Sequence, residues 1–284
     1  MADRINVMVN GLPGKMASRV ADYVNRAEDL ELFPFSLTGP EIEQERFDKV
    51  HLVKPRDRDD FLKDLKKFQH ARTLYPFISV DFTQPSAVNT NAEFYCRYGF
   101  DFVMGTTGGD RKLLEDTVIK SRTSAVIAPN MAKPIVLFQS MIQYAAENFP
   151  DAFRGYSLEI VESHQKGKAD TSGTALSMVE KPDGTKGYFN LLGMPFKKEQ
   201  IKMIRDPKIQ LEMGIPEVYL TGHGWHTYAL KSEDDTVLFR FTHNVNGRGV
   251  YAVGTLDAIR YLQNKVKMGH QGQVYSMIDV LKGK

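Results

Sequence analysis

The segment from residue 162 to residue 175 holds the side chains best suited to chemistry in this sequence. His164, Lys166 and Lys168 follow an apolar stretch in which a strand is expected, and Ser-Gly-Thr at 172–174 then opens a helix. Imidazole and ammonium groups transfer protons and add positive charge, and a helix N-terminus offers N–H groups to an anion. The pattern predicts a site for a small anionic substrate; a solvated basic loop before an ordinary N-cap is the alternative.

A glycine turn near the N-terminus is the second candidate site. An apolar run at 5–10 predicts a strand, and helical spacing of apolar residues begins at Lys15. A glycine turn between strand and helix lets backbone N–H groups approach a pyrophosphate. The match to the dinucleotide-binding pattern is incomplete, since Pro13 replaces its second glycine, so a plain connecting turn stays an alternative. The expected cofactor contacts are Gly11, Leu12, Pro13, Gly14, Lys15 and Met16.

The end of the second expected strand, at 30–37, bears on which nicotinamide cofactor is bound. That strand ends in Ser36-Leu37-Thr38 without a carboxylate that could hold a ribose diol. The hydroxyls of Ser36 and Thr38 could donate hydrogen bonds to a 2′-phosphate. The sequence therefore predicts NADPH, with NADH also accepted.

Three further loops follow expected strands of the N-terminal part. The carboxyl ends of parallel strands meet the ligand at one edge of the sheet, so we expect cofactor contacts there, although turn chemistry alone would explain each loop separately. These expected contacts are Phe82, Thr83, Gly105, Thr106, Thr107, Ala128, Pro129, Asn130 and Met131.

The alternation of strands and helices predicts an α/β fold with a Rossmann-type, doubly wound parallel sheet. Beyond it, a helix is expected at 135–149. Strands without long helices between them are then expected at 157–161, 210–213, 217–220, 226–230 and 237–243. This pattern is typical of a smaller α+β domain with a mixed or antiparallel sheet. The expected domains are 1–131 plus about 245–284, for the dinucleotide, and 132–244, for substrate binding and oligomerisation.

Composition narrows the class of protein. Of 284 residues, 42% are hydrophobic and 25% charged, which excludes disordered and collagen-like chains. The net charge of +2 comes from mixed charges and predicts no nucleic-acid surface, and no apolar run reaches the ~18–20 residues of a membrane span. The single cysteine, Cys96, favours a reducing compartment. We expect no signal or transit peptide here, and a cytoplasmic location, or the plastid stroma in a plant or alga.

Six motifs, taken together, resemble the dihydrodipicolinate reductase family. The stretch 162–175 is similar to the family signature E-x-H-H-x-x-K-x-D-x-P-S-G-T-A, and 11–16 is similar to its G-x-x-G-x-M turn. The other similar segments are Asp81-Phe82-Thr83 with Pro85, Gly105-Thr106-Thr107-Gly108, Pro129-Asn130-Met131, and Thr242-His243 with Arg248 and Gly254. Gln165 replaces the second histidine and no proline precedes Ser172, which, with Gly-His-Gly-Trp-His at 222–226, resembles the plant-type branch.

The resemblance implies an NAD(P)H-dependent reduction of 4-hydroxy-tetrahydrodipicolinate in the diaminopimelate route to lysine. It gives His164 the role of catalytic histidine, which either shuttles a proton or polarises the leaving hydroxyl, and Lys168 the role of proton donor. The substrate is a small cyclic dicarboxylate, and the residues implied to bind it are Gln165, Ser172, Gly173 and Thr174. Another two-domain NAD(P)-dependent dehydrogenase of an amino acid or sugar, and a non-catalytic NADPH sensor, are the alternatives.

Two expectations concern partners and metals. Exposed strand edges of the second sheet favour a homo-oligomer, either dimer or tetramer. His223 and His226 are spaced so that a strand would place them on opposite faces, and we expect no metal site.

Overall fold

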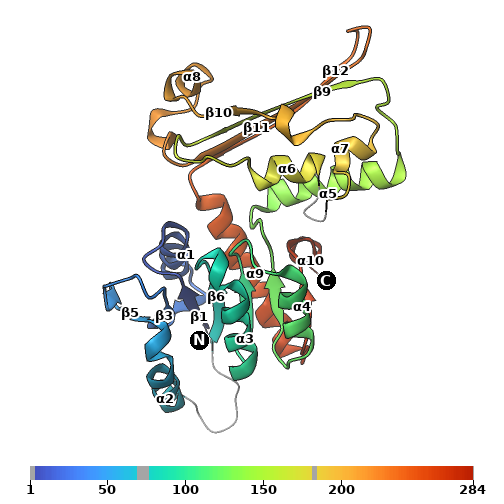
Figure 1. The fold of residues 1–284 in the computed structure, drawn as a ribbon. Coiled ribbons are helices and arrows are strands. Elements are labelled where there is room, and N and C mark those ends of the chain that lie inside the picture. The colour runs from blue at the N-terminus through green and yellow to red at the C-terminus, as the bar shows by residue number, and fades with distance from the viewer. Residues whose placement is uncertain (1–3, 69–76, 181–183, 284) are drawn as a thin grey trace. The chain divides into compact units, whose positions relative to one another are not determined.

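The structure is a computed structural model of the chain that describes all residues except 1–3, 69–76, 181–183 and 284 (Figure 1). The chain divides into two compact units. The first comprises Met1–Lys133 with Gly249–Lys284, and the second comprises Pro134–Arg248. These boundaries lie a few residues beyond the expected ones. Among the described residues, no helix combines the length and hydropathy that a membrane span requires.

The first unit is built on a six-stranded sheet in which all neighbouring strands run parallel. In sheet order the strands are β13 (Val274–Tyr275), β8 (Ala125–Ile127), β7 (Phe102–Met104), β6 (Phe77–Asp81), β1 (Ile5–Asn10) and β2 (Leu30–Leu32). Every residue of the central strand β6 is buried, as expected when helices cover both faces of a parallel sheet. The predicted doubly wound sheet is confirmed.

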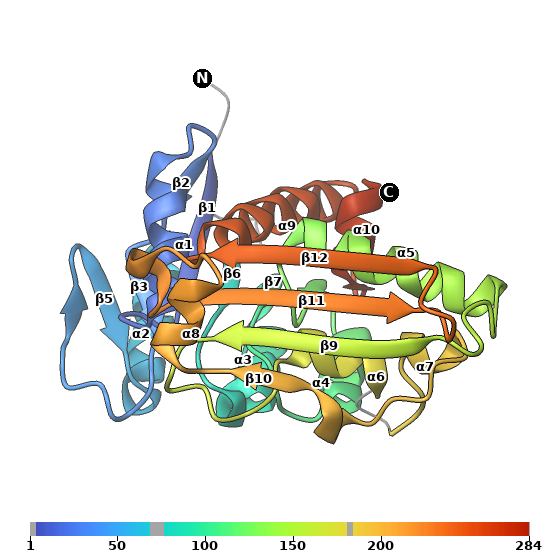
Figure 2. The ribbon, with the colours of Figure 1, turned by 90° about the horizontal axis from the view of Figure 1, so that it is seen from above.

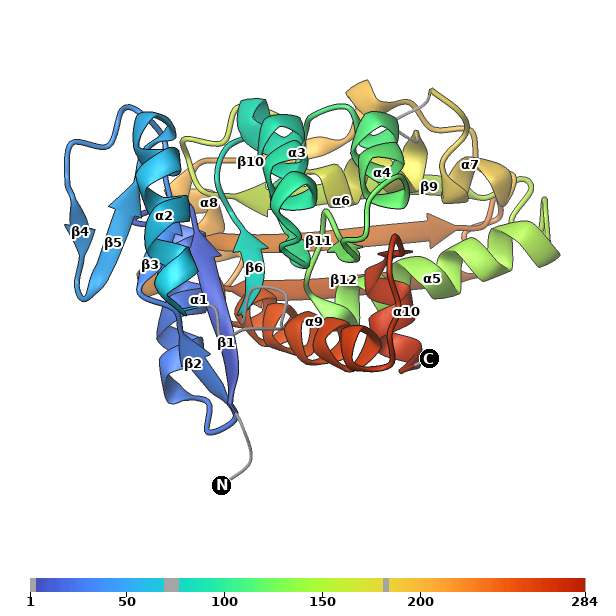
Figure 3. The same cartoon turned by 90° about the horizontal axis from the view of Figure 1, so that it is seen from below.

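Helices lie on both sides of these strands (Figure 3). Their bounds are α1 (Lys15–Arg26), α3 (Val88–Tyr98), α4 (Arg111–Ile119), α9 (Gly249–Lys267) and α10 (Met277–Lys282), and a short 3₁₀ turn, η2 (Pro85–Ala87), precedes α3. Helix α9 packs against α1 and against β1, β6, β7 and β8, whereas α3 packs against α4. The C-terminal segment therefore completes the first unit by supplying both a covering helix and the edge strand β13.

The strand expected at 30–37 is wrong, because the structure divides it at Pro34. Its first part is β2, which pairs with β1, and its second part is β3 (Phe35–Leu37), which pairs with β5 (Val50–Val53) in a separate sheet. Proline lacks the N–H group that a ladder needs. The small sheet is completed by β4 (Arg46–Phe47) and followed by η1 (Pro55–Asp57) and α2 (Arg58–Phe68).

The second unit carries a four-stranded mixed sheet (Figure 2). Its order is β10 (Lys202–Ile204), β9 (Ser157–His164), β11 (His223–Lys231) and β12 (Leu238–Asn246), with only the β10–β9 pair parallel. One face carries α5 (Lys133–Asn148), α6 (Gly173–Val179) and α7 (Tyr188–Leu191). Fully buried Ile160, Tyr228 and Phe189 lie in the core between these layers, which places β9 and its C-terminal end on a rigid support.

The strands expected at 210–213 and 217–220 are wrong. In their place the structure has a helix, α8 (Pro207–Glu212), and a 3₁₀ turn, η4 (Glu217–Tyr219). A further 3₁₀ turn, η3 (Lys198–Gln200), precedes β10. Asp206 caps α8 by accepting a 2.8 Å hydrogen bond from the Lys208 N–H, and Pro207 occupies the first helical turn. An Asp-Pro pair is a helix-start signal, and it outweighs the short apolar alternation.

Candidate active site

The glycine turn of the first unit has a conformation that other residues would strain. Gly11 has φ +98°, and a Cβ at this position would collide with the Phe82 carbonyl. Its N–H donates to the Leu37 carbonyl at 2.8 Å, and the Gly14 N–H donates to the Gly11 carbonyl at 2.8 Å. No side chain in the described part of the chain caps the start of α1, so the first turn of this helix has N–H groups of the kind that bind phosphate.

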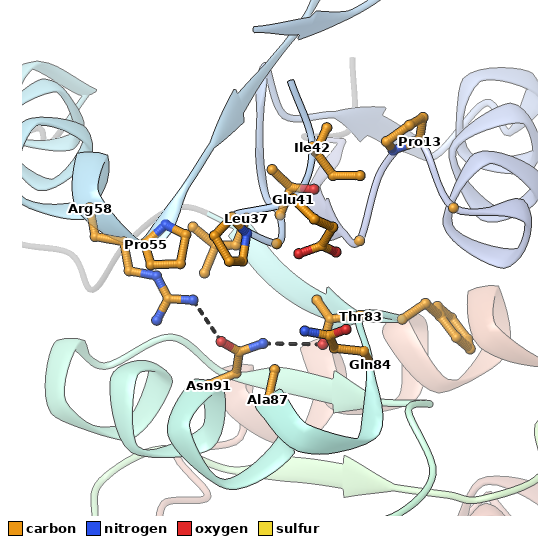
Figure 4. Close-up of a pocket in the computed structure, with 16 residues that line it drawn as sticks. Pro13, Leu37, Glu41, Ile42, Pro55, Arg58, Thr83, Gln84, Ala87 and Asn91 are labelled. Carbon is orange, nitrogen blue, oxygen red and sulfur yellow. Dashed lines mark hydrogen bonds between the residues drawn. The ribbon is translucent and has the colours of Figure 1, made fainter. Parts of the chain in front are cut away.

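A cavity of about 330 Å³ opens beside this turn, entirely within the first unit (Figure 4). Its walls come from the glycine turn, the loop after β3, η1 with the start of α2, and the loop after β6 with the start of α3. Among the described residues that line it, Glu41 supplies a carboxyl group and Arg58 a guanidinium group. The Glu41 carboxylate points into the cavity, while Arg58 extends toward Asn91, with Nη2 2.7 Å from Asn91 Oδ1.

A buried carboxylate, Asp81, organises the loops around the cavity. Its Oδ1 accepts hydrogen bonds from the Thr83 N–H at 3.0 Å, from Thr83 Oγ1 at 2.8 Å and from Thr106 Oγ1 at 2.6 Å. Its Oδ2 accepts from Asn91 at 3.0 Å and from the Tyr95 hydroxyl at 2.7 Å. Asp81 thereby joins two of the loops that the sequence assigned to the cofactor. We did not foresee this role, although Asp81 stands in a motif singled out above.

The end of β3 and the loop after it differ from expectation in the polar groups that they could offer to a cofactor. The Ser36 side chain is fully buried, with Oγ 3.4 Å from the Leu12 N–H, and the Thr38 hydroxyl donates to the Leu12 carbonyl at 2.8 Å. Both hydroxyls therefore support the glycine turn from inside the protein. Glu41 was overlooked, because it follows the strand end by four residues; a Cβ at Gly39 would overlap its carboxylate.

The remaining expected contacts of the first unit also fall on loops after strands. Gly105 lies against the Phe82 ring, so closely that a Cβ would collide with it. Thr106 is buried against Asp81, and Thr107 is exposed. In the loop after β8, Asn130 Oδ1 accepts from the Ala132 N–H at 2.9 Å, while Ala128 and Met131 are buried and Pro129 is exposed.

His164 ends β9 in the second unit as a neutral imidazole. Its Nδ1 lies 3.0 Å from the His223 carbonyl, and because a carbonyl only accepts, Nδ1 carries the proton. Burial, with a contribution from Arg205, lowers the His164 pKa to about 4. Nε2 is buried, has no hydrogen-bond partner among the described residues, and lies 4.0 Å from Glu162 Oε2. At neutral pH, Nε2 of His164 thus carries a lone pair that no described residue uses.

Lys168 lies in the loop that follows. Its N–H donates to the Gln165 carbonyl at 3.0 Å, and its side chain is 21% exposed, with Nζ 2.9 Å from Asp170 Oδ1. The hydrogen bond from this ammonium lowers the pKa of the Asp170 carboxyl. The positive charge of Lys168 also helps to lower the His164 pKa. The loop therefore holds a shielded ammonium in electrostatic contact with a neutral imidazole.

The start of α6 presents fewer free N–H groups than expected. Ser172 is its N-cap and accepts hydrogen bonds from the N–H groups of Thr174 at 3.2 Å and Ala175 at 3.4 Å. The Thr174 N–H is therefore not free. Gly173 is exposed, and its N–H has no hydrogen-bond partner within the described parts of the chain. Gln165 is half-buried beside His164.

Several site residues escaped the sequence reasoning. Fully buried Glu162 accepts a hydrogen bond from Arg205 at 2.6 Å on Oε1 and from the Ser172 N–H at 2.9 Å on Oε2. His226 Nε2 lies 2.9 Å from Ser172 Oγ. Glu162, His164 and His226 bring potential metal-ligand atoms within 4.8 Å of one another. Because both Glu162 oxygens and His226 Nε2 already have partners, we assign these groups to a hydrogen-bond network.

Comparisons with known proteins agree across the whole chain. Residues 5–131 match the family model described as dihydrodipicolinate reductase, N-terminus, and residues 134–281 match the one described as its C-terminus. A chloroplastic 4-hydroxy-tetrahydrodipicolinate reductase 1 of Arabidopsis thaliana is 42% identical over 98% of this chain and 78% of its own length. A rice relative, "Probable 4-hydroxy-tetrahydrodipicolinate reductase 1, chloroplastic", is 42% identical over 97% of this chain and 78% of its length.

Solved structures extend the agreement to the fold. A dihydrodipicolinate reductase from Paenisporosarcina sp. TG-14, described as dipicolinate-bound, aligns with a TM-score of 0.61 at 20% identity, covering 96% of this chain and 97% of the other. At that identity the likeness shows the fold alone. The matches of both halves to the family models and the 42% identity to near full-length relatives carry the assignment, and this chain belongs to the dihydrodipicolinate reductase family.

Proposed function

We propose that the chain catalyses NAD(P)H-dependent reduction of 4-hydroxy-tetrahydrodipicolinate to tetrahydrodipicolinate in the diaminopimelate route to lysine. Family membership supports this reaction. The observation that carries the residue roles is the loop after β9, where His164 is neutral and Lys168 is a shielded cation. Such a pair can accept one hydrogen bond from the substrate and give one proton to it.

The first unit is the proposed binding site of the dinucleotide, which supplies the hydride when bound. Its fit rests on the glycine turn, where Gly11 lies so close to the Phe82 carbonyl that no Cβ fits, because a glycine turn of this kind lets the backbone approach a pyrophosphate. The start of α1 offers backbone N–H groups to the phosphates, whereas the Gly14 N–H is held by the Gly11 carbonyl. The loops joined by Asp81 hold Phe82, Thr83 and Thr106 in place, and these would face the rest of the cofactor.

We propose NADPH as the cofactor, with NADH also accepted. Arg58 lines the cavity beside the glycine turn and is the cation available to a 2′-phosphate. Glu41 lines the same cavity, where a carboxylate accepts hydrogen bonds from a free ribose diol and repels a phosphate. The two residues favour opposite cofactors, which supports acceptance of both.

The second unit is the proposed substrate site. Because His164 is neutral, we assign it the proton shuttle: its Nε2 takes the proton that the ring loses and passes it to the hydroxyl, which leaves as water. We assign Lys168 the proton that reaches the ring nitrogen as the hydride adds and electron density builds there. The Gly173 N–H, with Gln165 nearby, would bind a substrate carboxylate. A relative solved with dipicolinate bound supports a small dicarboxylate as the substrate.

A coupled assay tests the proposal. The substrate is made enzymatically from pyruvate and aspartate semialdehyde, and NADPH consumption is followed by absorbance. We expect turnover by the wild type and a loss of ~10²-fold or more in both His164→Ala and Lys168→Ala. NADPH binding without turnover would indicate a sensor, turnover of another amino acid or sugar alone would indicate a different dehydrogenase, and near-normal turnover of both variants would refute the assigned roles.

We also propose a homo-oligomer, either dimer or tetramer. The sheet of the second unit ends in an edge strand, β12, whose residues Leu238 and Phe239 are exposed, and exposed edges favour pairing. Light scattering of the purified protein tests this. For location we propose the cytoplasm, or the plastid stroma in a plant or alga, the latter supported by relatives named as chloroplastic.

A further inference from the structure

Glu162 and Arg205 form a buried ion pair to which the proposed chemistry gives no task. Arg205 Nη2 lies 2.6 Å from Glu162 Oε1; the Glu162 side chain is fully buried and that of Arg205 is 17% exposed. Removing two charges from water costs free energy that their attraction often fails to recover, and apolar side chains would often stabilise the same space equally well. A role other than core stability is therefore worth seeking in what the pair touches.

Arg205 touches the backbone of the loop that carries Lys168. Its Nε donates to the Lys168 carbonyl at 2.8 Å, and Nη2 also lies 3.3 Å from the Asp170 carbonyl. Nη1 donates to the Ile204 carbonyl at 3.0 Å, so all three guanidinium nitrogens have partners. Ile204 ends β10, which pairs with β9 at Ser163. The sheet thus anchors the guanidinium, and the guanidinium anchors the loop.

Glu162 fixes the far end of the same loop. Its Oε2 accepts a 2.9 Å hydrogen bond from the Ser172 N–H, at the start of α6. A further contact at the near end comes from Gln210 of α8, which donates to the His164 carbonyl at 2.7 Å. The loop between β9 and α6 is therefore held at its start, middle and end by side chains beneath it, and Arg205 supplies the contacts at its middle.

We propose that Arg205 and Glu162 are positioning residues of the reductase, which hold the Lys168 backbone so that its ammonium keeps a fixed place relative to His164. The inference rests on the proposed function of Lys168. Hydrogen bonds from a charged donor to main-chain carbonyls are stronger and more directional than neutral ones. A proton donor displaced by about 1 Å loses on the order of 10²-fold in rate, which sets the size of the expected effect.

The first test replaces the guanidinium and then supplies it again. In Arg205→Ala we expect kcat to fall by about 10²-fold. Guanidinium chloride at low millimolar concentration should then raise the kcat of this variant by at least about tenfold. Arg205→Lys should stay impaired, because one ammonium cannot reproduce the planar fork. NADH binding, followed by fluorescence, should stay within about twofold of wild type, because the cavity lining lies wholly in the first unit.

A matched control comes from the same unit. Arg154 pairs with Asp151 at 2.5 Å on the surface, with a side chain 77% exposed, and Arg154→Ala should leave kcat unchanged. If Arg205→Ala does not fold, Arg205→Gly, which leaves the same space for guanidinium, takes its place in the rescue, and Arg205→Met, which keeps most of the side-chain stem, takes its place in the comparison of kcat. Retention of kcat within about threefold in the folded variant, or a loss that guanidinium does not reduce, would overturn the proposal.

The second test asks whether Arg205 acts through Lys168. If it does, the double variant Arg205→Ala/Lys168→Ala should turn over no more slowly than Lys168→Ala alone. A double variant whose loss is the product of the two single losses would contradict the positioning role. Normal turnover of Lys168→Ala would instead contradict the proposed function, whatever Arg205→Ala does, so the two failures are distinguishable.

Discussion

The imidazole rings of His226 and His243 stack with their centroids 4.6 Å apart and their planes 26° apart. Neither ring nitrogen of His243 has a hydrogen-bond partner among the described residues. Burial lowers the His243 pKa to about 4, and burial together with the neighbouring His243 and His164 lowers the His226 pKa well below its usual range. Both rings are therefore neutral at pH 7, on adjacent strands of one sheet.

The lowered pKa values of these two rings predict that the protein loses stability as the pH falls from about 6.5 toward about 4. In the unfolded chain these histidines take up protons near pH 6.5, whereas folded His243 stays neutral down to about pH 4. The unfolded state binds more protons in this window, so the free energy of unfolding rises with pH. The contribution of the neutral histidines to that free energy reaches its full value above about pH 6.5. Urea denaturation between pH 4.5 and 7.5 measures it.

His243→Phe is the variant that assigns this slope. Phenylalanine keeps a ring beside Phe138 and Tyr228 and removes one titrating group, so the slope should fall by up to about 1.4 kcal/mol per pH unit. An unchanged slope in this variant would show that His243 is not among the groups responsible.

If the cavity beside the glycine turn holds the cofactor as proposed, Glu41 and Arg58 should set the ratio of NADPH to NADH affinity. Glu41→Gln removes the charge that repels a 2′-phosphate, so the ratio of dissociation constants should move toward NADPH by about tenfold, equivalent to about 1.4 kcal/mol. Arg58→Ala should move it toward NADH. Fluorescence titration with both dinucleotides measures the ratio, and Glu43→Gln, outside the cavity lining, is the control. Unchanged ratios in both variants would contradict the assignment.

The close approach of Gly11 to the Phe82 carbonyl predicts the effect of a single methyl group. Gly11→Ala combines that collision with a positive φ, so we expect about 1–3 kcal/mol less stability and dinucleotide binding weakened by about tenfold or more. Gly167→Ala is the matched control, since a Cβ there meets no heavy atom within 4 Å. Calorimetric titration with NADPH and a thermal melt should separate the two variants; equal behaviour would contradict the role of the turn.

Two fully buried tyrosines predict opposite responses to loss of a hydroxyl. The Tyr95 hydroxyl donates to Asp81 at 2.7 Å and accepts from Asn10 at 3.0 Å, so Tyr95→Phe should cost about 1.5–3 kcal/mol. The Tyr228 hydroxyl has no hydrogen-bond partner in the described part of the chain, so Tyr228→Phe should cost under about 0.5 kcal/mol or stabilise the protein. Chemical denaturation of both variants checks the contrast.

Local patterns identified those parts of the fold that local physics determines. Strand, glycine turn and helix at 5–26 follow from hydrophobic periodicity and from the backbone freedom of Gly11. The division of the second strand at Pro34 could have been foreseen, because a proline removes a ladder hydrogen bond. The Asp206-Pro207 pair likewise indicates the start of a helix, in a region where a strand was expected.

The network behind the active-site loop was not accessible in this way. Arg205 is 43 residues from Glu162 in the sequence, and nothing near either residue indicates that they meet. Their contact depends on the parallel pairing of β10 with β9, which is a long-range property of the sheet. Glu41 was missed for a related reason, since only the course of the loop after β3 brings its carboxylate to the cavity.

The second unit is inserted between two parts of the first, and this has a consequence for biosynthesis. Strand β13 and helix α9, which complete the first unit, come from residues after 248. During translation, all of Pro134–Arg248 leaves the ribosome before the last strand of the first unit's sheet is made. The inserted unit can therefore fold while the first unit is still incomplete. A chain that lacks the residues after 248 would leave uncovered the surface of the first unit against which α9 packs.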